Sequence, residues 1–422
     1  MPRSQSSLPA TPSVLKYHNR ELILNCFRDN QEHSVADIVA RTGISKLTVM
    51  RAIQFFCRKN ILVSSGKGES TEQGGKRPEF FRFDYNKYLL TVMLWPDTLG
   101  LTLFSMDLTE ICRSSFSWII PSTPEEAFAF VKDQAMALLK QAGIRREDLY
   151  GVSLSTSGIV DYSSLVLKFS THSPEWGNDI PIGRYLKNIF GDDLCYFVEN
   201  SGKCIGRTIL RDQEDPLKRI LVLFTSWGLS ASLIQDGKIL SGRDSLIGEV
   251  GHMILDPSDT EQCSCGSCGC MERLVSISRL RKRIAMDPPP AASPLSKVAP
   301  EAVGLNHLFF ASRQGDPYAR SYVTYLADCF SALLRNVSLV FNPETVVFVG
   351  DYSIADAYFD QRMRQQFHQF HYLASGSPID VRYDTRILSE LDARGGAAAL
   401  LDHFFSDPNL YEDTEPQGGH HA

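Results

Sequence analysis

Residues 248–274, GEVGHMILDPSDTEQCSCGSCGCMERL, hold the densest group of potential metal ligands in the chain. Four cysteines fall within eight positions, and His252 stands eleven residues before the first of them. The cysteines are Cys263, Cys265, Cys268 and Cys270. Zinc binds thiolates and neutral imidazole in a tetrahedron, and glycines within this run allow the tight turn that such binding needs. We therefore predict a zinc site made by His252 and three of the cysteines.

A site closed by four protein ligands leaves no position for water or substrate, so this zinc should be structural and not catalytic. The alternative is a redox-active or accidental thiol cluster, which the histidine disfavours. The chain has 10 cysteines in all but lacks the apolar leader of a secreted protein. Reduced thiols and a cytoplasmic location are therefore expected. No run reaches the ~18 apolar residues of a membrane span.

Charge is divided unevenly along the 422 residues, whose net charge is −6. Residues 1–88 hold 14 Lys/Arg against 8 Asp/Glu, a net charge of +6, and the remainder holds 29 against 41, a net charge of −12. A basic head on an acidic body is typical of a small DNA-binding module joined to a different functional domain.

The basic head has the pattern of a helix-turn-helix within residues 17–84, and residues 1–16 are expected to form a disordered tail. In SVADIVARTGISKLTVMRAIQFF, Ser34 and Ser45 can each cap a helix, and Gly43 can supply the turn between the helices. Side chains near the start of the second helix would reach a major groove. These candidates for DNA contact are Ser45, Lys46, Thr48 and Arg51.

A wing should follow, because residues 61–83 read as two short strands around a polar, glycine-rich loop. Lys76 and Arg77 in that loop could reach a phosphate or the minor groove. Two short helices around a glycine can mimic a helix-turn-helix. The turn, the basic wing and the local positive charge coincide here, and together they favour binding to double-stranded DNA.

The acidic body alternates strand-like and helical segments, which predicts an α/β architecture in two lobes. Strands are expected at residues 88–95, 99–107 and 344–351, with a hairpin at 219–240 and a long helix at 321–342.

Several motifs of the body resemble the ROK family of repressors and sugar kinases. GEVGH followed by CSCGSCGCMER matches the family pattern of G-H, about ten residues, then C-x-C-G-x-x-G-C-x-E. The family pattern has no counterpart of Cys268, which leaves His252, Cys263, Cys265 and Cys270 as the ligands. The resemblance extends through TSGIVD (156–161), PEW (174–176), VENSG (198–202), NPETVVFVGD (342–351) and DARGGAAALL (392–401), and the head resembles the winged helix of the family's repressors.

The resemblance implies an actin-like (ribonuclease-H-like) fold with two lobes around a sugar-binding cleft. The first lobe would span residues 85–200 and be completed by a C-terminal helix at 390–405. The second lobe would span residues 201–389 and carry the zinc loop at 252–270, and residues 406–422 would be a mobile tail. The positions that match the family's sugar contacts are Asn200, Glu249, His252 and Glu272.

The chain departs from the family's kinases at three places. Ser201 stands where they have the aspartate that activates the sugar hydroxyl, and loss of such a base typically costs ~10²–10⁴ in rate. The first strands lack the phosphate-binding D-x-G-x-T loop, and Trp227 interrupts the second phosphate loop, SWGLS. We therefore expect no catalytic residues and no kinase activity.

These features predict a sugar-responsive transcriptional regulator, most simply a repressor of carbohydrate-metabolism genes. It would bind operator DNA as a homodimer or higher homo-oligomer, with a sugar or sugar phosphate as effector and no membrane partner. Two alternatives remain open. One is a DNA-binding regulator whose degenerate cleft is controlled by a protein partner, and the other is a residual sugar kinase.

Overall fold

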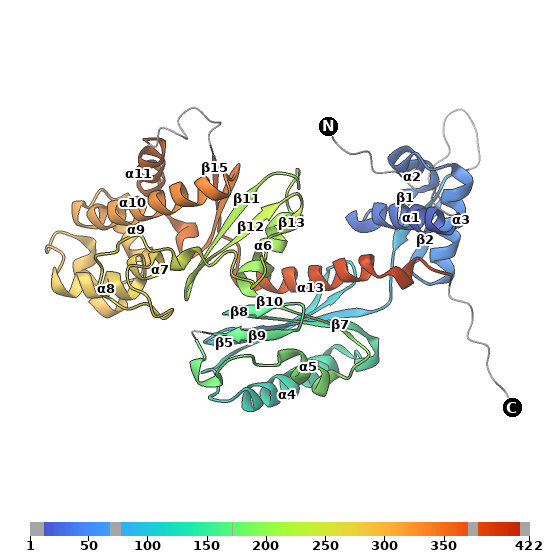
Figure 1. The fold of residues 1–422 in the computed structure, drawn as a ribbon, viewed down its shortest axis with the longest axis horizontal. Helices are drawn as coiled ribbons and strands as arrows, with labels where there is room; N and C mark the ends of the chain where they lie inside the picture. Colours follow the sequence, from blue (N-terminus) through green and yellow to red (C-terminus); the bar gives the residue numbers. More distant parts are fainter. Residues whose placement is uncertain (1–11, 68–76, 171, 370–378, 414–422) are drawn as a thin grey trace.

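The computed structural model describes residues 12–67, 77–170, 172–369 and 379–413. They form an N-terminal head and two α/β lobes, and the helix α13 (Leu388–Ser406) runs from the second lobe across the first lobe to the head (Figure 1). This arrangement is the expected two-lobed α/β body behind a winged helix-turn-helix.

The head contains three helices and a three-stranded sheet in the order β1-β3-β2. Its elements are α1 (Pro12–Asn25), β1 (His33–Ser34), α2 (Val35–Thr42), α3 (Lys46–Arg58), β2 (Leu62–Lys67) and β3 (Glu79–Phe83). Ser34 and Asp37 form a capping box at the start of α2, Gly43 ends that helix with a φ of 69°, and Ser45 caps α3. The predicted helix-turn-helix is confirmed. Its helix ends are set by caps and a left-handed glycine, which depend on residues close together in the sequence.

Both expected tails are in part ordered, which corrects the predicted boundaries at residues 16 and 406. Helix α1 already begins at Pro12, and Tyr411 is buried with its ring 5.2 Å from that of Tyr17. Lys59 donates hydrogen bonds to the carbonyls of residues 409, 410 and 412. The buried ring of Tyr411 and the hydrogen bonds from Lys59 thus hold the segment at 409–412 against the head, although its composition is polar. Residues 1–11 and 414–422 lie outside the described residues.

The first lobe is built on a five-stranded sheet with the order β10-β7-β4-β5-β6. Its strands are β4 (Tyr88–Leu94), β5 (Thr98–Ser105), β6 (Glu110–Ser117), β7 (Leu149–Thr156) and β10 (Cys195–Asn200). Leu90 faces a core shared with α4 (Pro124–Ala142) and α5 (Ile182–Phe190), whereas its neighbour Leu89 faces α13 on the opposite side. Because successive side chains of a strand point to opposite faces of the sheet, apolar residues on both faces allow helices to pack on each of them.

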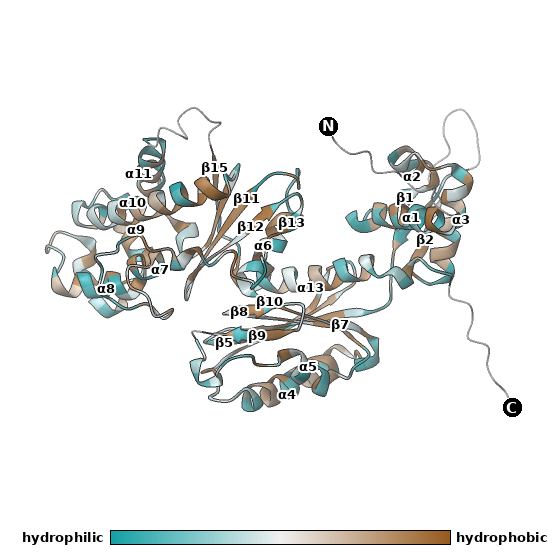
Figure 2. Cartoon of the chain, viewed as in Figure 1, coloured by the Kyte–Doolittle hydropathy of each residue, from teal (hydrophilic) through white to brown (hydrophobic). Residues whose placement is uncertain are grey.

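The second lobe repeats this topology with the order β13-β12-β11-β14-β15. Its strands are β11 (Ile220–Thr225), β12 (Leu229–Gln235), β13 (Lys238–Ile239), β14 (Thr345–Gly350) and β15 (Asp380–Asp384). Helix α6 (Ser201–Arg211) covers one face, and the other face packs against α8 (Ile277–Met286), α9 (Leu305–Arg313), α10 (Pro317–Val340) and α11 (Ala357–His368). Strands β11 and β12 are largely apolar between these layers (Figure 2).

Helix α10 is the one helix of the described residues that is long and apolar enough to span a membrane by length and composition. Half of its most apolar stretch is buried inside the protein, and its residues Val323, Phe330 and Val337 belong to the second-lobe core. Its apolar character is therefore explained by packing and is weak evidence for a membrane span.

Helices α13 and α6 cross at very close range. A Cβ atom on Gly395 would lie 1.8 Å from the carbonyl oxygen of Cys204, which is a backbone atom that cannot rotate away. Thr208 of α6 also donates a hydrogen bond of 2.7 Å to the carbonyl of Leu391. The crossing therefore requires glycine at position 395 and fixes how α6 lies on α13.

Substitution of Gly395 by Ala should destabilise the protein by about 1–3 kcal/mol, because the two helices must move apart. The intrinsic preference of Ala for a helix, ~1 kcal/mol over Gly, does not remove this clash. Urea unfolding of the full chain measures the change. The control is Gly100→Ala, whose new Cβ would come under 3 Å only from the flexible end of the Met93 side chain, at 2.8 Å. Equal stability of both variants would contradict the close crossing.

Candidate ligand cleft, metal centre and DNA-binding face

A cavity of about 360 Å³ opens between the two lobes. The turn after β4, the loop after β7 and the end of β10 line it from the first lobe, and the β11–β12 turn lines it from the second. All four residues that match the family's sugar contacts, Asn200, Glu249, His252 and Glu272, line this one cavity. Two carboxylates, an amide and an imidazole are suited to the hydroxyls of a polyol, which both donate and accept hydrogen bonds.

Asn200 joins the cleft floor to helix α6. Its side-chain oxygen accepts from the backbone N–H of Gly202 at 2.8 Å and so caps α6, while its amide nitrogen donates to the carbonyl of Gly158 at 2.8 Å. These two bonds fix the orientation of the amide group. One N–H and one lone pair of Asn200 remain for a ligand.

The two glutamates of the cleft are held differently. Glu272 accepts a 2.8 Å hydrogen bond from the backbone N–H of Leu229, and a Cβ at position 228 would lie 2.7 Å from its carboxylate, so Gly228 makes room for it. Burial raises the pKa of Glu249, and the charges of His252 and Lys203 oppose this shift. A partly desolvated carboxyl group gains from hydrogen bonds that a ligand supplies.

His252 and three cysteines converge beside the cleft. The potential ligand atoms of His252, Cys263, Cys265 and Cys270 all lie within 4.8 Å of one another. Nδ1 of His252 is 3.6 Å from the sulfur of Cys263, and the sulfurs of Cys265 and Cys270 are 3.6 Å apart. A tetrahedral ion with bonds of about 2.0–2.3 Å would require separations of about 3.5–3.8 Å. The geometry therefore fits a metal ion.

Cys268 points away from this group, because its sulfur contacts the carbonyl oxygen of Thr260 at 3.7 Å. Gly269 explains how the chain reverses between Cys268 and Cys270. It has a φ of 75°, and a Cβ there would lie 2.0 Å from the carbonyl of Asp256. The turn thus directs Cys270 inward and leaves Cys268 outside the cluster.

Two tryptophans that line the cleft, one from each lobe, pack against each other. The rings of Trp95 and Trp227 have centroids 4.6 Å apart in an edge-to-face arrangement. The indole N–H of Trp95 donates to Ser201 and to the buried carboxylate of Asp392, both at 2.9 Å. The indole N–H of Trp227 donates to Asp97 at 3.3 Å. The indole ring of Trp95 thus lies beside Ser201 and is covered by that of Trp227.

Three residues of this region were not predicted from the sequence: Trp95, His172 and Asp392. Burial lowers the pKa of His172, opposed by the charge of Glu272, so the neutral imidazole is favoured in the cleft. Burial raises the pKa of Asp392 to about 7, and hydrogen bonds from its neighbours oppose this shift. His172 stands two residues before the PEW motif and Asp392 opens the DARGG motif, which are signals that could have pointed to both.

Of the candidate DNA-contacting residues that the structure describes, Thr48 is half-buried, and the others, Ser45, Lys46, Arg51 and Arg77, are exposed. Ser45 and Thr48 contact each other at the start of α3, with their hydroxyl oxygens 2.9 Å apart. Lys46 and Arg77 line a shared groove formed by α2, α3 and residues 77–81, whereas Arg51 lies on the exposed surface of α3 outside that groove. Lys76 lies outside the described residues.

The metal cluster predicts unequal effects of two neighbouring cysteines. Cys265→Ser should lower the bound metal well below one equivalent per chain and reduce thermal stability, because a site with three strong ligands holds the loop poorly. Cys268→Ser, the matched control, should keep full metal content. Elemental analysis of the purified proteins measures both. Metal loss from the Cys268 variant alone would contradict the ligand set.

Comparison with known proteins places this architecture in a family. The ROK family model matches residues 102–403. The xylose repressor of Caldicellulosiruptor bescii is 23% identical over 378 residues, which cover 86% of this chain and 90% of the repressor. A glucokinase of Thermotoga maritima is 28% identical over 211 residues, but these cover 48% of this chain and only 64% of the glucokinase.

Solved structures show the same fold. The crystal structure of a ROK family transcriptional regulator, a homolog of the E. coli MLC protein, superposes with a TM-score of 0.74 at 18% identity, covering 94% of this chain and 99% of that one. A ROK hexokinase from Thermus thermophilus gives a TM-score of 0.60 at 21% identity, covering 76% of this chain and 100% of the hexokinase. The chain therefore belongs to the ROK family, in the branch that places a winged helix-turn-helix before the two lobes.

Proposed function

We propose that this chain is a sugar-responsive transcriptional regulator that represses carbohydrate-metabolism genes. The observation that carries the proposal is the single cavity lined by Asn200, Glu249, His252 and Glu272, in a body that also bears a winged helix. A xylose repressor and a regulator similar to the MLC protein match most of this chain, which supports the same role. The head would bind operator DNA as part of a cytoplasmic homodimer or higher homo-oligomer.

The contacts around Ser201 support a regulator over a kinase. A serine hydroxyl is a poor general base near neutral pH, and the Ser201 oxygen already accepts a hydrogen bond from Trp95. Trp95 and Trp227 pack together at the turns where the family's kinases carry phosphate loops. Phosphates need backbone N–H groups with free space in front of them, and two indole rings take that space.

The metal of the His252 site is zinc in this proposal, because three thiolates and one imidazole form a set that zinc prefers. When bound, zinc contributes a structural link between the loop at 252–270 and the cleft. Nδ1 of His252 faces the sulfur of Cys263, and its Nε2 lies 4.0 Å from the carboxylate of Glu249. The ring is thus oriented to offer its second nitrogen to a sugar hydroxyl.

Sugar binding would act on DNA through the angle between the lobes. The cavity is shared by both lobes, so a ligand that fits one separation better than another shifts their equilibrium. A ~10-fold preference supplies ~1.4 kcal/mol per site. Helix α13 lies on the first lobe and packs with the head, so this change would alter how the two heads of a dimer are spaced.

The proposed DNA contact of Arg51 can be tested by substitution. Arg51→Ala should weaken binding to the upstream region of the chain's own operon and lower the slope of log affinity against log salt by ~0.9, the value for one lost phosphate contact. Fluorescence anisotropy at several salt concentrations measures both quantities. Arg243→Ala is the control, because the Arg243 side chain is 92% exposed on the second lobe. Identical salt slopes for all three proteins would contradict a role for Arg51.

The sugar site can be tested with unphosphorylated aldoses, including xylose and glucose. One of them at ~100 times its Kd should add ~2.7 kcal/mol of stability in a thermal-shift assay. Glu272→Gln should abolish most of this gain while keeping the fold, since the glutamine oxygen can still accept from Leu229. Glu301→Gln, on an exposed turn, should behave as the parent protein.

Two outcomes of that assay favour the alternatives. A cleft that responds to none of the sugars would favour control by a protein partner. ATP consumption that depends on a sugar, measured in a coupled assay, would favour a residual kinase, the activity that the similarity to glucokinases suggests.

A further inference from the structure

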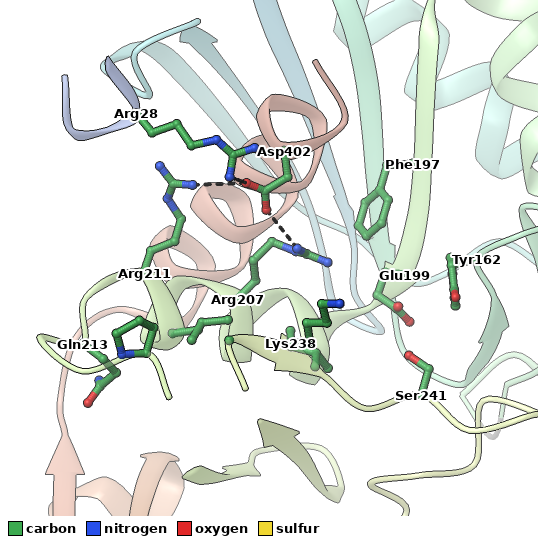
Figure 3. A pocket seen from close by; sticks show the side chains of 14 residues that line it. Arg28, Tyr162, Phe197, Glu199, Arg207, Arg211, Gln213, Lys238, Ser241 and Asp402 are labelled. Atoms are coloured by element: carbon green, nitrogen blue, oxygen red, sulfur yellow. Dashed lines mark hydrogen bonds and ion pairs between the residues drawn. The ribbon is translucent and has the colours of Figure 1, made fainter. Parts of the chain in front are cut away.

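A second cavity, of about 740 Å³, lies next to the sugar cleft, and its lining includes four cationic and two anionic side chains (Figure 3). We call it the arginine cavity. Its cations are Arg28 from the head, Arg207 and Arg211 from α6, and Lys238 from β13. They belong to three separate parts of the fold, so tertiary structure brings them together.

Three of these cations share one carboxylate. Asp402 of α13 lies 3.1 Å from Arg207, 3.4 Å from Arg211 and 3.5 Å from Arg28 (Figure 3). A single carboxylate cannot satisfy three guanidinium groups, each of which carries several N–H donors. Within the described part of the chain, the Nε atoms of Arg28 and Arg207 are buried and have no hydrogen-bond partner.

The second carboxylate of the cavity is already matched. Glu199 accepts a 2.9 Å hydrogen bond from the backbone N–H of Asn200 and lies 3.7 Å from the buried ammonium of Lys203. Lys238 has no ion pair among the residues that the structure describes. The four cations therefore exceed the available negative charge, and the three arginines gathered around Asp402 favour an added anion.

Burial supports the same conclusion. It lowers the pKa of Arg211, the charge of Asp402 opposes this shift, and the neighbouring guanidinium groups of Arg28 and Arg207 add to it. A dianion placed among these groups would form charge-assisted hydrogen bonds in a partly desolvated site, where such bonds are strong. Phosphate offers several acceptor oxygens in the geometry that guanidinium groups match.

The remaining walls fit an organic group attached to such an anion. The ring of Phe197 lies 5.5 Å from the guanidinium of Arg207, and Tyr162, Gln213 and Ser241 add an aromatic face and polar atoms (Figure 3). The volume falls within the ~300–1,000 Å³ that is usual for small-molecule sites. We propose that the arginine cavity binds a small phosphate monoester, with its phosphate among Arg28, Arg207, Arg211 and Lys238.

This site would be separate from the sugar cleft but connected to it. Glu199 lines the arginine cavity, and the next residue, Asn200, lines the sugar cleft. Helix α6 begins at the cleft with Ser201 and ends at the arginine cavity with Arg211. An anion would compete with Asp402 for Arg28 and so change how the head is held; this effect on DNA binding rests on the proposed function, whereas anion binding does not.

Isothermal titration calorimetry on the full chain, without DNA, tests the site with inorganic phosphate, glucose 6-phosphate and glucose. We expect glucose 6-phosphate to bind more tightly than inorganic phosphate, and both to weaken at least ~10-fold in Arg207→Gln. Arg243→Gln, the exposed control, should bind as the parent does. Glu272→Gln should keep its affinity for inorganic phosphate, because that residue lines the other cavity.

Lys238→Gln provides a second variant in case loss of Arg207 disturbs the fold, because its removal breaks no ion pair that the structure describes. It should also weaken binding of both phosphates while leaving the melting temperature unchanged.

Three results would overturn the proposal: no heat with either phosphate, unchanged affinity in both cavity variants, or loss of phosphate binding in Glu272→Gln. A fourth would be a marked loss of DNA affinity in Lys238→Gln without any added anion, since it would assign the cavity to DNA phosphates. If the protein bound no operator DNA, the result of the anion titration would still hold. The proposed regulatory function and the proposed anion site can therefore fail separately.

Discussion

Between Gly395 of α13 and the carbonyl of Cys204 in α6 there is no room for a side chain, and this contact joins the two lobes. The same helix α13 lies on the first-lobe sheet, and its Phe404 and Phe405 share one apolar core with the head. A close-packed interior transmits displacement instead of absorbing it. Helix α13 therefore links the two lobes and the head in one continuous body, as the proposed control of DNA binding by a ligand requires.

The candidate metal ligands lie on one side of the cleft, and two tryptophans lie on the other. On one side lies the loop that carries the cluster of His252 and three cysteines, and His252 also lines the cavity. On the other side Trp95 contacts Ser201 and the buried Asp392 and packs against Trp227. The cleft thus combines polar side chains with a pair of packed indole rings. The arginine cavity adds a separate region of positive charge against α6.

Local patterns predicted much of the fold. The caps at Ser34 and Ser45, the turn at Gly43 and the β11–β12 hairpin all depend on residues close together in the chain, and the structure confirms them. The strand β6 was missed because its residues are mostly exposed and polar at an edge of the sheet. The ordered segment around Tyr411 was missed because its burial depends on α1 and α3, far away in the sequence.

By itself the sequence determined the helix-turn-helix, the charge division between head and body, the spacing of the metal ligands and the family to which the chain belongs. These are short-range or compositional features, set by side-chain type and by separations of a few residues. Tertiary structure alone decided that Trp95 meets Trp227, and that Asp402 gathers Arg28, Arg207 and Arg211. Such contacts join residues far apart along the chain, and no local pattern encodes them, because they exist only once the lobes, α13 and the head have packed together.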